Sequence, residues 1–187
     1  MSNRVLIIID FFNPNGFSET PRLAGPALVA ARRTAALKVR LRRARVPVIY
    51  ANDNFGQWQS NFSMLVAICK GLSGEAGQIA DMLAPRPADW SLLKPRHSAF
   101  FGTPLVALLD DLDADTLILL GVSAESCVWM TACDAHTRGI GLVVPVDTMA
   151  GVSAPALRAT VRSLHEVLGA RTPARAASLR FANARIL

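Results

Sequence analysis

The sequence predicts an α/β fold in which a mostly parallel sheet is covered by helices on both faces. Short segments rich in Val, Ile and Leu alternate along the chain with longer segments of helical spacing. The short segments lack the polar alternation of half-exposed strands, as expected of strands that are buried on both faces. Strands that alternate with helices form right-handed βαβ crossovers. With 187 residues and 51% hydrophobic side chains, the chain is expected to form a single domain over residues 1–187.

The first half of the chain is expected to supply three strands and the helices between them. Pro26 suits the first turn of a helix, where its missing N–H costs nothing. Pro85 and Pro87 enforce an extended connection before the third strand, which has the weakest pattern. In chain order the expected elements are a strand at 4–10, a loop at 13–25, a helix at 26–45, a strand at 46–51, a helix at 61–69, a short helix ending at 83 and a strand at 90–93.

The second half repeats the alternation with clearer boundaries. Thr103 can cap a helix that begins at Pro104, and Gly139 can end the helix before it. The expected elements are a helix from 104, a strand at 116–120, a helix at 125–138, a strand at 142–146 and an amphipathic helix at 155–168. After Arg171 the periodicity fades, so the tail at 172–187 is either a docking arm for a partner or loosely ordered.

Composition favours a soluble cytoplasmic protein. The longest apolar runs fall well short of the roughly 18 residues of a membrane span. Asp10 ends the first apolar run before a signal-peptide core can form. The three cysteines are an odd number without a CxxC pair, which indicates neither a disulfide framework nor a thiolate zinc site, and fits a reducing compartment.

The formal net charge of +6 raises the alternative of nucleic-acid binding, because clustered cations can neutralise phosphates. Alanine, leucine and valine interleave with the densest cluster, as in an amphipathic helix with a solvated face. We therefore expect a surface helix and no nucleic-acid partner. The cluster consists of Arg32, Arg33, Lys38, Arg40, Arg42, Arg43 and Arg45.

Polar residues at the ends of the predicted strands indicate where a ligand binds. Open parallel sheets bind ligands at the carboxyl ends of their strands. Asp10, Asn52, Lys94 and the turn at Gly121 all follow predicted strands. The sequence therefore directs the search for a site to these four positions.

Cys127 is the strongest candidate nucleophile. It lies between a buried strand and the first turn of a helix, where unpaired backbone N–H groups and the helix dipole favour a thiolate and can stabilise an oxyanion. A buried structural cysteine remains an equal alternative at this point, because the helix is rich in Ala, Val and Met. Cys133 and Cys69 lack such a setting and are expected to be structural.

Other readings of the same segments are weaker. A phosphatase of the HAD type needs a second aspartate two residues after Asp10, where the chain has Phe12. Ser123 lies in a sequence similar to the GxSxG nucleophile elbow, but the last glycine is missing. A Cys–His pair that uses His97 stays open, although nothing in the local sequence supports it. No paired histidine spacing predicts a metal site.

Four blocks of sequence together resemble the isochorismatase-like hydrolase family, which includes nicotinamidases and carbamoyl-amide hydrolases. They occur in the order of the family and extend from the first strand to Gly151. The blocks are VLIIIDFFNP at 5–14, VIYAND at 48–53, Lys94 with SAFFGTPL at 98–105, and LILLGVSAESCV at 117–128 continuing through TACDA at 131–135 to Asp147.

The resemblance implies a three-layer α/β/α fold around a six-stranded, mostly parallel sheet. It also implies a catalytic triad of Asp10, Lys94 and Cys127, and a cis peptide bond between Val122 and Ser123. The backbone N–H groups of Ser123 and Cys127 would form the oxyanion hole. The implied activity is that of a cysteine hydrolase that cleaves a carbon–nitrogen bond other than a peptide bond, in a small amide, ureido or N-carbamoyl substrate.

The sequence departs from nicotinamidases after the second strand, where those enzymes place Asp and His ligands for a metal. The segment here is NDNFGQW at 52–58, without histidine. We therefore expect no metal and no other cofactor, and nicotinamide is a less favoured substrate. Family members that hydrolyse isochorismate lack the cysteine, so Cys127 argues against that reaction.

The substrate pocket and the partners are predicted more loosely. Residues that flank the triad segments could hold a small planar substrate against an aromatic face. The family resemblance implies a homo-oligomer, either a dimer or a tetramer. A non-catalytic binding or interaction protein on the same fold is the main alternative, because membership of a family does not establish activity. The proposed pocket residues are Phe11, Asn13, Asn52, Trp58 and Phe101.

Overall fold

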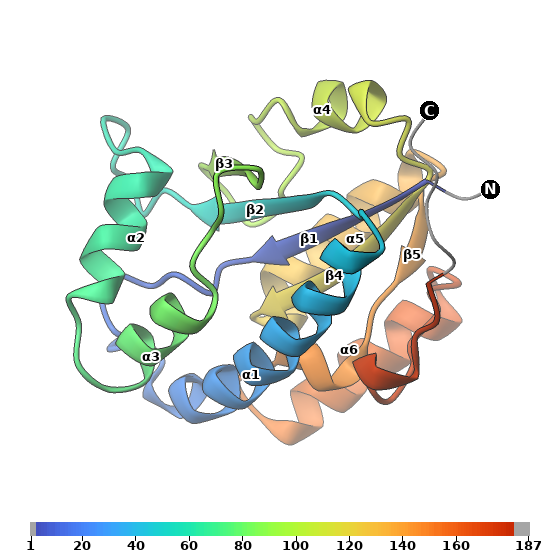
Figure 1. Cartoon of the computed structure of the whole chain (residues 1–187). Coiled ribbons are helices and arrows are strands. Elements are labelled where there is room, and N and C mark those ends of the chain that lie inside the picture. Colours follow the sequence, from blue (N-terminus) through green and yellow to red (C-terminus); the bar gives the residue numbers. More distant parts are fainter. Residues whose placement is uncertain (1–2, 182–187) are drawn as a thin grey trace.

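The computed structural model describes residues 3–181 and confirms the predicted α/β fold. Figure 1 shows a central sheet with helices on both faces. The strands are β1 (Arg4–Ile9), β2 (Val48–Asp53), β3 (Trp90–Lys94), β4 (Thr116–Val122), β5 (Gly141–Val143) and β6 (Met149–Ala150). The longer helices are α1 (Pro21–Arg43), α2 (Phe62–Lys70), α3 (Gly74–Met82), α4 (Leu105–Asp111), α5 (Trp129–Thr137) and α6 (Ala154–Glu166).

All six strands are parallel, in the order β3-β2-β1-β4-β5, and β6 pairs with the far end of β4. The chain moves outward in one direction from β1 through β2 to β3, and then crosses back to β4 on the other side of β1. The strand order therefore reverses between β1 and β4. Ligands of open parallel sheets bind outside the carboxyl ends of the strands at such a reversal.

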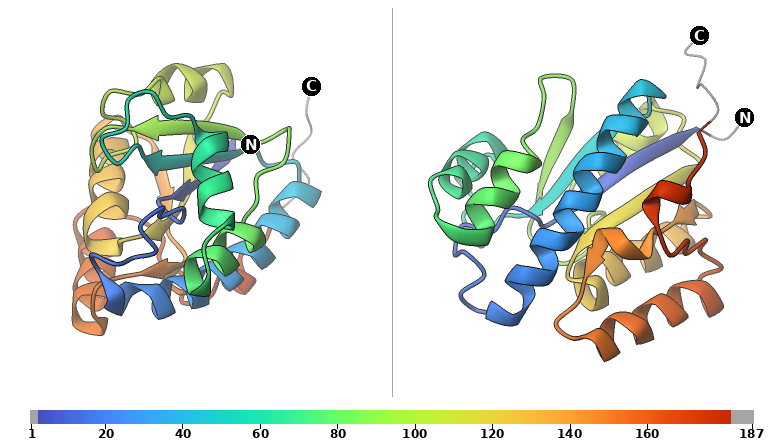
Figure 2. Two further views of the ribbon diagram at one scale, coloured as in Figure 1. Left: turned by 90° about the vertical axis from the view of Figure 1, so that its left-hand side faces the viewer. Right: turned by 60° about the horizontal axis from the view of Figure 1, so that its bottom comes forward.

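Two hydrophobic clusters cover the two faces of the sheet. One combines Leu6, Ile8 and Tyr50 with the buried sides of α1, α2 and α3. The other combines Ile7 and Ile49 with α4, α5 and α6. Figure 2 shows the same layers from two further sides. The alternation of strand residues between the two clusters explains why β1 is apolar at every position from Val5 to Ile9.

Several boundaries differ from the prediction. Helix α1 begins at Pro21, five residues before Pro26, which lies inside the helix. Pro21 therefore has the first-turn position that we assigned to Pro26. The segment before α5 is a π-helical turn, Ala124–Val128, where a regular helix was expected. Strand β5 ends at Val143, and the two-residue β6 has no counterpart in the prediction.

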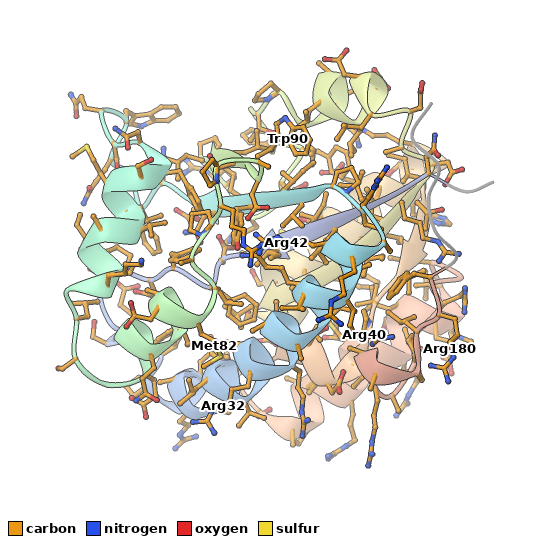
Figure 3. All side chains as sticks on the ribbon, viewed as in Figure 1. Arg32, Arg40, Arg42, Met82, Trp90 and Arg180 are labelled. Atoms are coloured by element: carbon orange, nitrogen blue, oxygen red, sulfur yellow. The ribbon has the colours of Figure 1, made fainter. Side chains whose placement is uncertain are left out.

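The described part of the tail packs against its own chain. Ala176 and Leu179 are buried, and the Arg40 guanidinium donates to the carbonyl oxygens of both. Figure 3 shows Arg40 of α1 beside this segment. Residues 172–181 thus contact α1, while the rest of the predicted docking arm, 182–187, lies outside the described residues. Across 3–181, no helix is both long enough and apolar enough to cross a membrane.

Candidate active site

Three predicted site residues lie at the carboxyl edge of the sheet. Asp10 directly follows β1, with a left-handed backbone (φ 52°) that turns its carboxylate out of the strand direction. Lys94 is the last residue of β3, opposite Asp53 of β2. Cys127 lies in the π-helical turn that follows β4. The parallel register brings these strand ends to one place although they are distant in sequence.

The close pairing of β4 with β1 depends on Gly121, which lies inside β4 opposite Ile9 and not in a turn after the strand, as was expected. Its φ is 138°, and a Cβ at this position would lie 2.2 Å from the carbonyl oxygen of Ile9. Only glycine therefore allows β4 to pass so close to the end of β1. This close approach places the segment that carries Cys127 beside Asp10.

Asp10 and Lys94 form a buried ion pair. The Lys94 Nζ is 2.7 Å from Asp10 Oδ2, and the Lys94 side chain has no exposed surface. The backbone N–H of Asp53 donates to Asp10 Oδ1 at 2.6 Å, and Lys94 Nζ donates to the carbonyl oxygen of Arg96 at 3.3 Å. Asp53 Oδ2 lies 3.8 Å from Lys94 Nζ. These contacts fix both charged groups in one orientation.

The Cys127 sulfur completes this group. Lys94 Nζ is 3.6 Å from Cys127 Sγ, and Asp10 is close enough to the sulfur for its charge to raise the pKa of Cys127. The structure thus brings Asp10, Lys94 and Cys127 into mutual contact. In this arrangement a carboxylate can accept the thiol proton while an ammonium lies beside both.

Burial and charge set the protonation states. Burial raises the pKa of Asp10 above its ordinary value although Lys94 opposes this. For Lys94, burial acts to lower the pKa, but Asp10, Cys127 and Asp53 outweigh it, so the pKa is raised. Burial, followed by the Asp10 charge, raises the pKa of Cys127 to about 12. The resting group is therefore a thiol, contrary to the thiolate that the helix terminus alone suggested.

The backbone around Ser123 has an unusual conformation beside Cys127. The peptide bond between Val122 and Ser123 is cis. The carbonyl oxygen of Ser123 accepts from the N–H groups of Ser126 and Val128. Within residues 3–181, neither the N–H of Ser123 nor that of Cys127 donates to a backbone carbonyl outside its own helix.

The predicted pocket residues divide into two groups. Phe11 is 1% exposed and belongs to the core, and the Asn52 amide is occupied by both backbone polar groups of Phe12. These placements argue against a pocket role for either residue. Asn13 accepts from the N–H of Asn15. Trp58 and Phe101 are 75% and 60% exposed, so their rings are available to a ligand.

Two residues of the site, His97 and Asp53, carry little local signal in the sequence. His97 was left without local support, yet its Nδ1 is 3.7 Å from Cys127 Sγ. Asp53 was not singled out, yet it binds Asp10 through its N–H and faces Lys94. Its position at the end of a predicted strand was the signal that could have identified it. Within 3–181, no three His, Cys, Asp or Glu side chains lie close enough together to hold a metal ion.

Comparison with known proteins places this geometry in context. The model of the family described as "Isochorismatase domain" matches residues 4–172. An uncharacterized isochorismatase family protein of Bacillus subtilis, YaaI, is 32% identical over 152 residues, which cover 81% of this chain and 83% of that protein. The maleamate amidohydrolase of Pseudomonas putida is 26% identical over 147 residues, which cover 74% of this chain and 68% of that enzyme.

A solved structure shows the same fold. The N-carbamoylsarcosine amidase of Thermoplasma acidophilum superimposes with a TM-score of 0.73 and 24% identity. The superposition covers 96% of this chain and 99% of that one. The arrangement of strands and helices is thus shared over almost the whole length.

Proposed function

The chain belongs to the isochorismatase family, and from this premise we propose that it is a cysteine hydrolase that cleaves a carbon–nitrogen bond in a small amide. Amidohydrolases occur among its relatives, including the maleamate enzyme. The observation that carries the proposal is the contact of Cys127 with the buried Asp10–Lys94 pair. Cys127 also favours amide cleavage over isochorismate hydrolysis.

In the first step Asp10 accepts the thiol proton as Cys127 attacks the amide carbonyl. The raised pKa makes Asp10 a better base than an ordinary aspartate. Proton transfer is most efficient when the pKa of the catalytic base lies near the working pH. Lys94 keeps its charge because its pKa is raised, and so holds Asp10 and stabilises the developing thiolate. The N–H groups of Ser123 and Cys127 stabilise the oxyanion.

Collapse of the tetrahedral intermediate breaks the carbon–nitrogen bond. Asp10 returns its proton to the departing nitrogen, so ammonia or an amine leaves and an acyl-thioenzyme remains. Water then hydrolyses the thioester and regenerates the Cys127 thiol. Asp10 is the base for this second step as well in the simplest form of the mechanism.

The substrate is a small amide, ureide or N-carbamoyl compound. The exposed rings of Trp58 and Phe101 are the aromatic surfaces left for a planar group. We propose that no metal or other cofactor takes part, because the 52–58 segment lacks the histidine ligands that nicotinamidases place there. Assembly as a dimer or tetramer and a cytoplasmic location follow from the family resemblance and the unpaired cysteines.

Ammonia release from a panel of amides, ureides and N-carbamoyl compounds, including maleamate and N-carbamoylsarcosine, tests the proposal. The wild type should release ammonia from at least one of them. Cys127→Ala should abolish release, while Cys133→Ala on the adjoining helix α5 should retain it. Release that persists in Cys127→Ala would contradict the assigned nucleophile.

A further inference from the structure

His97 contacts the Cys127 sulfur in addition to the Asp10–Lys94 pair. Its Nδ1 is 3.7 Å from Cys127 Sγ and 3.4 Å from Ser126 Oγ. Its side chain is exposed, whereas the Lys94 side chain is fully buried. The sulfur thus contacts a buried acid–base pair and also an imidazole that is accessible to water.

The loop that carries His97 is anchored to the helix that follows Cys127. Ser98 Oγ donates to Asp134 Oδ2 at 2.5 Å. The N–H of Ala99 donates to Thr131 Oγ1 at 3.0 Å, and the same hydroxyl donates to the carbonyl oxygen of Cys127 at 2.7 Å. Two independent links therefore hold the backbone that follows His97 against α5. A fixed position of this kind is what an acid–base group requires.

We propose that His97 is a further catalytic residue, the base that activates water when the acyl-thioenzyme is hydrolysed. The proposal rests on the proposed function and refines it, because it removes the second base role from Asp10. Asp10 acts on the buried side during acylation, and His97 acts on the exposed side during deacylation. The tautomer protonated at Nε2 leaves Nδ1 free to accept a proton.

The step balances without any additional reactant. Water attacks the acyl carbon as its proton passes to His97 Nδ1, and a carbon–oxygen bond forms. The carbon–sulfur bond then breaks, the acid leaves, and the imidazolium returns the proton to the sulfur. The 3.7 Å contact between Nδ1 and Sγ is the path for this return.

His97→Gln tests the division of labour, with His136→Gln as the matched control. His136 is an exposed histidine near the end of α5, the helix that follows Cys127. The substrate is the amide from which the wild type releases ammonia fastest. We expect kcat of His97→Gln to fall roughly 10²-fold. KM should fall in proportion, so kcat/KM, which reports acylation, should stay within about threefold.

Two further readouts separate this role from a structural one. Intact-protein mass spectrometry during turnover should show that His97→Gln accumulates the acyl-enzyme, and the first equivalent of ammonia per site should appear as a burst. The acid limb of the kcat–pH profile should change in His97→Gln. Asp10, Lys94 and Cys127 lie around the same sulfur and are unchanged in both variants.

Other results would overturn either the role of His97 or the proposed function. If kcat/KM of His97→Gln falls as far as kcat, or no acyl-enzyme accumulates, His97 is not the deacylation base. If His97→Gln behaves as His136→Gln does, the proposal is equally overturned, although the nucleophile stands as long as Cys127→Ala is inactive. If the wild type forms no acyl-enzyme with any amide, the proposed function itself fails.

Discussion

Two lysines are buried in this molecule, and their surroundings differ in kind. Lys94 lies at the carboxyl end of β3 in contact with Asp10 and Cys127, with no exposed side-chain surface. Lys38 lies on α1, is 3% exposed, and donates to the carbonyl oxygens of Leu83 and Ala84. Each has a carboxylate within 4.0 Å, but the separation is 2.7 Å for Lys94 and 3.6 Å for Lys38.

The difference appears in the protonation of the two ammonium groups. Burial lowers the pKa of Lys38 to about 8, aided by Arg42 and opposed by Asp89. At Lys94 the nearby carboxylates and the Cys127 sulfur outweigh the same penalty, and the pKa is raised. Lys38 also bonds the Tyr50 hydroxyl and so links α1 to β2 and to the segment before β3. The charge of Lys94 thus lies beside the sulfur, whereas Lys38 binds α1 to its neighbouring segments.

The largest expected effect comes from exchanging each lysine for methionine. Lys94→Met removes the charge beside the sulfur and leaves Asp10 buried without its partner. Its kcat/KM should fall roughly 10³-fold or more, the scale of losing an acid–base partner. Lys38→Met should keep kcat/KM within about threefold. Steady-state ammonia release gives kcat/KM of both variants. Equal losses of kcat/KM would contradict the different roles of the two lysines.

The next effect concerns stability when a carboxylate is neutralised. Asp10→Asn should destabilise the fold by about 3 kcal/mol, because it leaves the buried Lys94 charge without its closest partner. Asp89→Asn should cost about 1 kcal/mol, since Lys38 keeps its two carbonyl acceptors. Urea unfolding followed by circular dichroism gives both values. A larger loss for Asp89→Asn would reverse our ranking of the two pairs.

The smallest effect is a pH dependence that belongs to Lys38. In the folded state its pKa is about 8, against an ordinary value of 10.5. Between these values the unfolded chain binds a proton that the folded chain has released, so the free energy of unfolding should rise with pH. Below about pH 8 both states are protonated and this slope disappears. Urea titrations from pH 7 to 9.5 should show the rise in the wild type relative to Lys38→Met; parallel curves would contradict the lowered pKa.

The sequence identified Lys94 and overlooked Lys38 for a physical reason. Lys94 follows a predicted strand, and the carboxyl ends of parallel strands meet at one edge, so position alone indicated a site. Lys38 lies among arginines on a helix, and that spacing indicates a solvated face. Its burial arises from packing against Tyr50 and the 83–84 segment, which are distant in sequence. Long-range packing of this kind leaves no local signal.

The same limit applies to details of the candidate site. The pattern of the residues predicts the fold class and five of the six parallel strands, and the family resemblance implies the sixth strand and the meeting of Asp10, Lys94 and Cys127. The π-helical turn at Ala124–Val128 has no distinct pattern in the sequence. The approach of His97 depends on how the 95–101 loop is anchored to α5, which joins segments distant in sequence. Phe11 was expected near a pocket because it follows Asp10, but residues that follow a strand can equally turn back into the core.

The most direct test of the central claim is to locate the covalent intermediate. Wild-type protein is mixed with the amide that it hydrolyses fastest, quenched in acid within one turnover, and digested for peptide mass spectrometry. The acyl group should be found on the peptide that contains Cys127, and the peptides of Cys69 and Cys133 should be unmodified. Ammonia release at full rate with no acyl group on Cys127 at any quench time, in the wild type and in His97→Gln, would contradict the account.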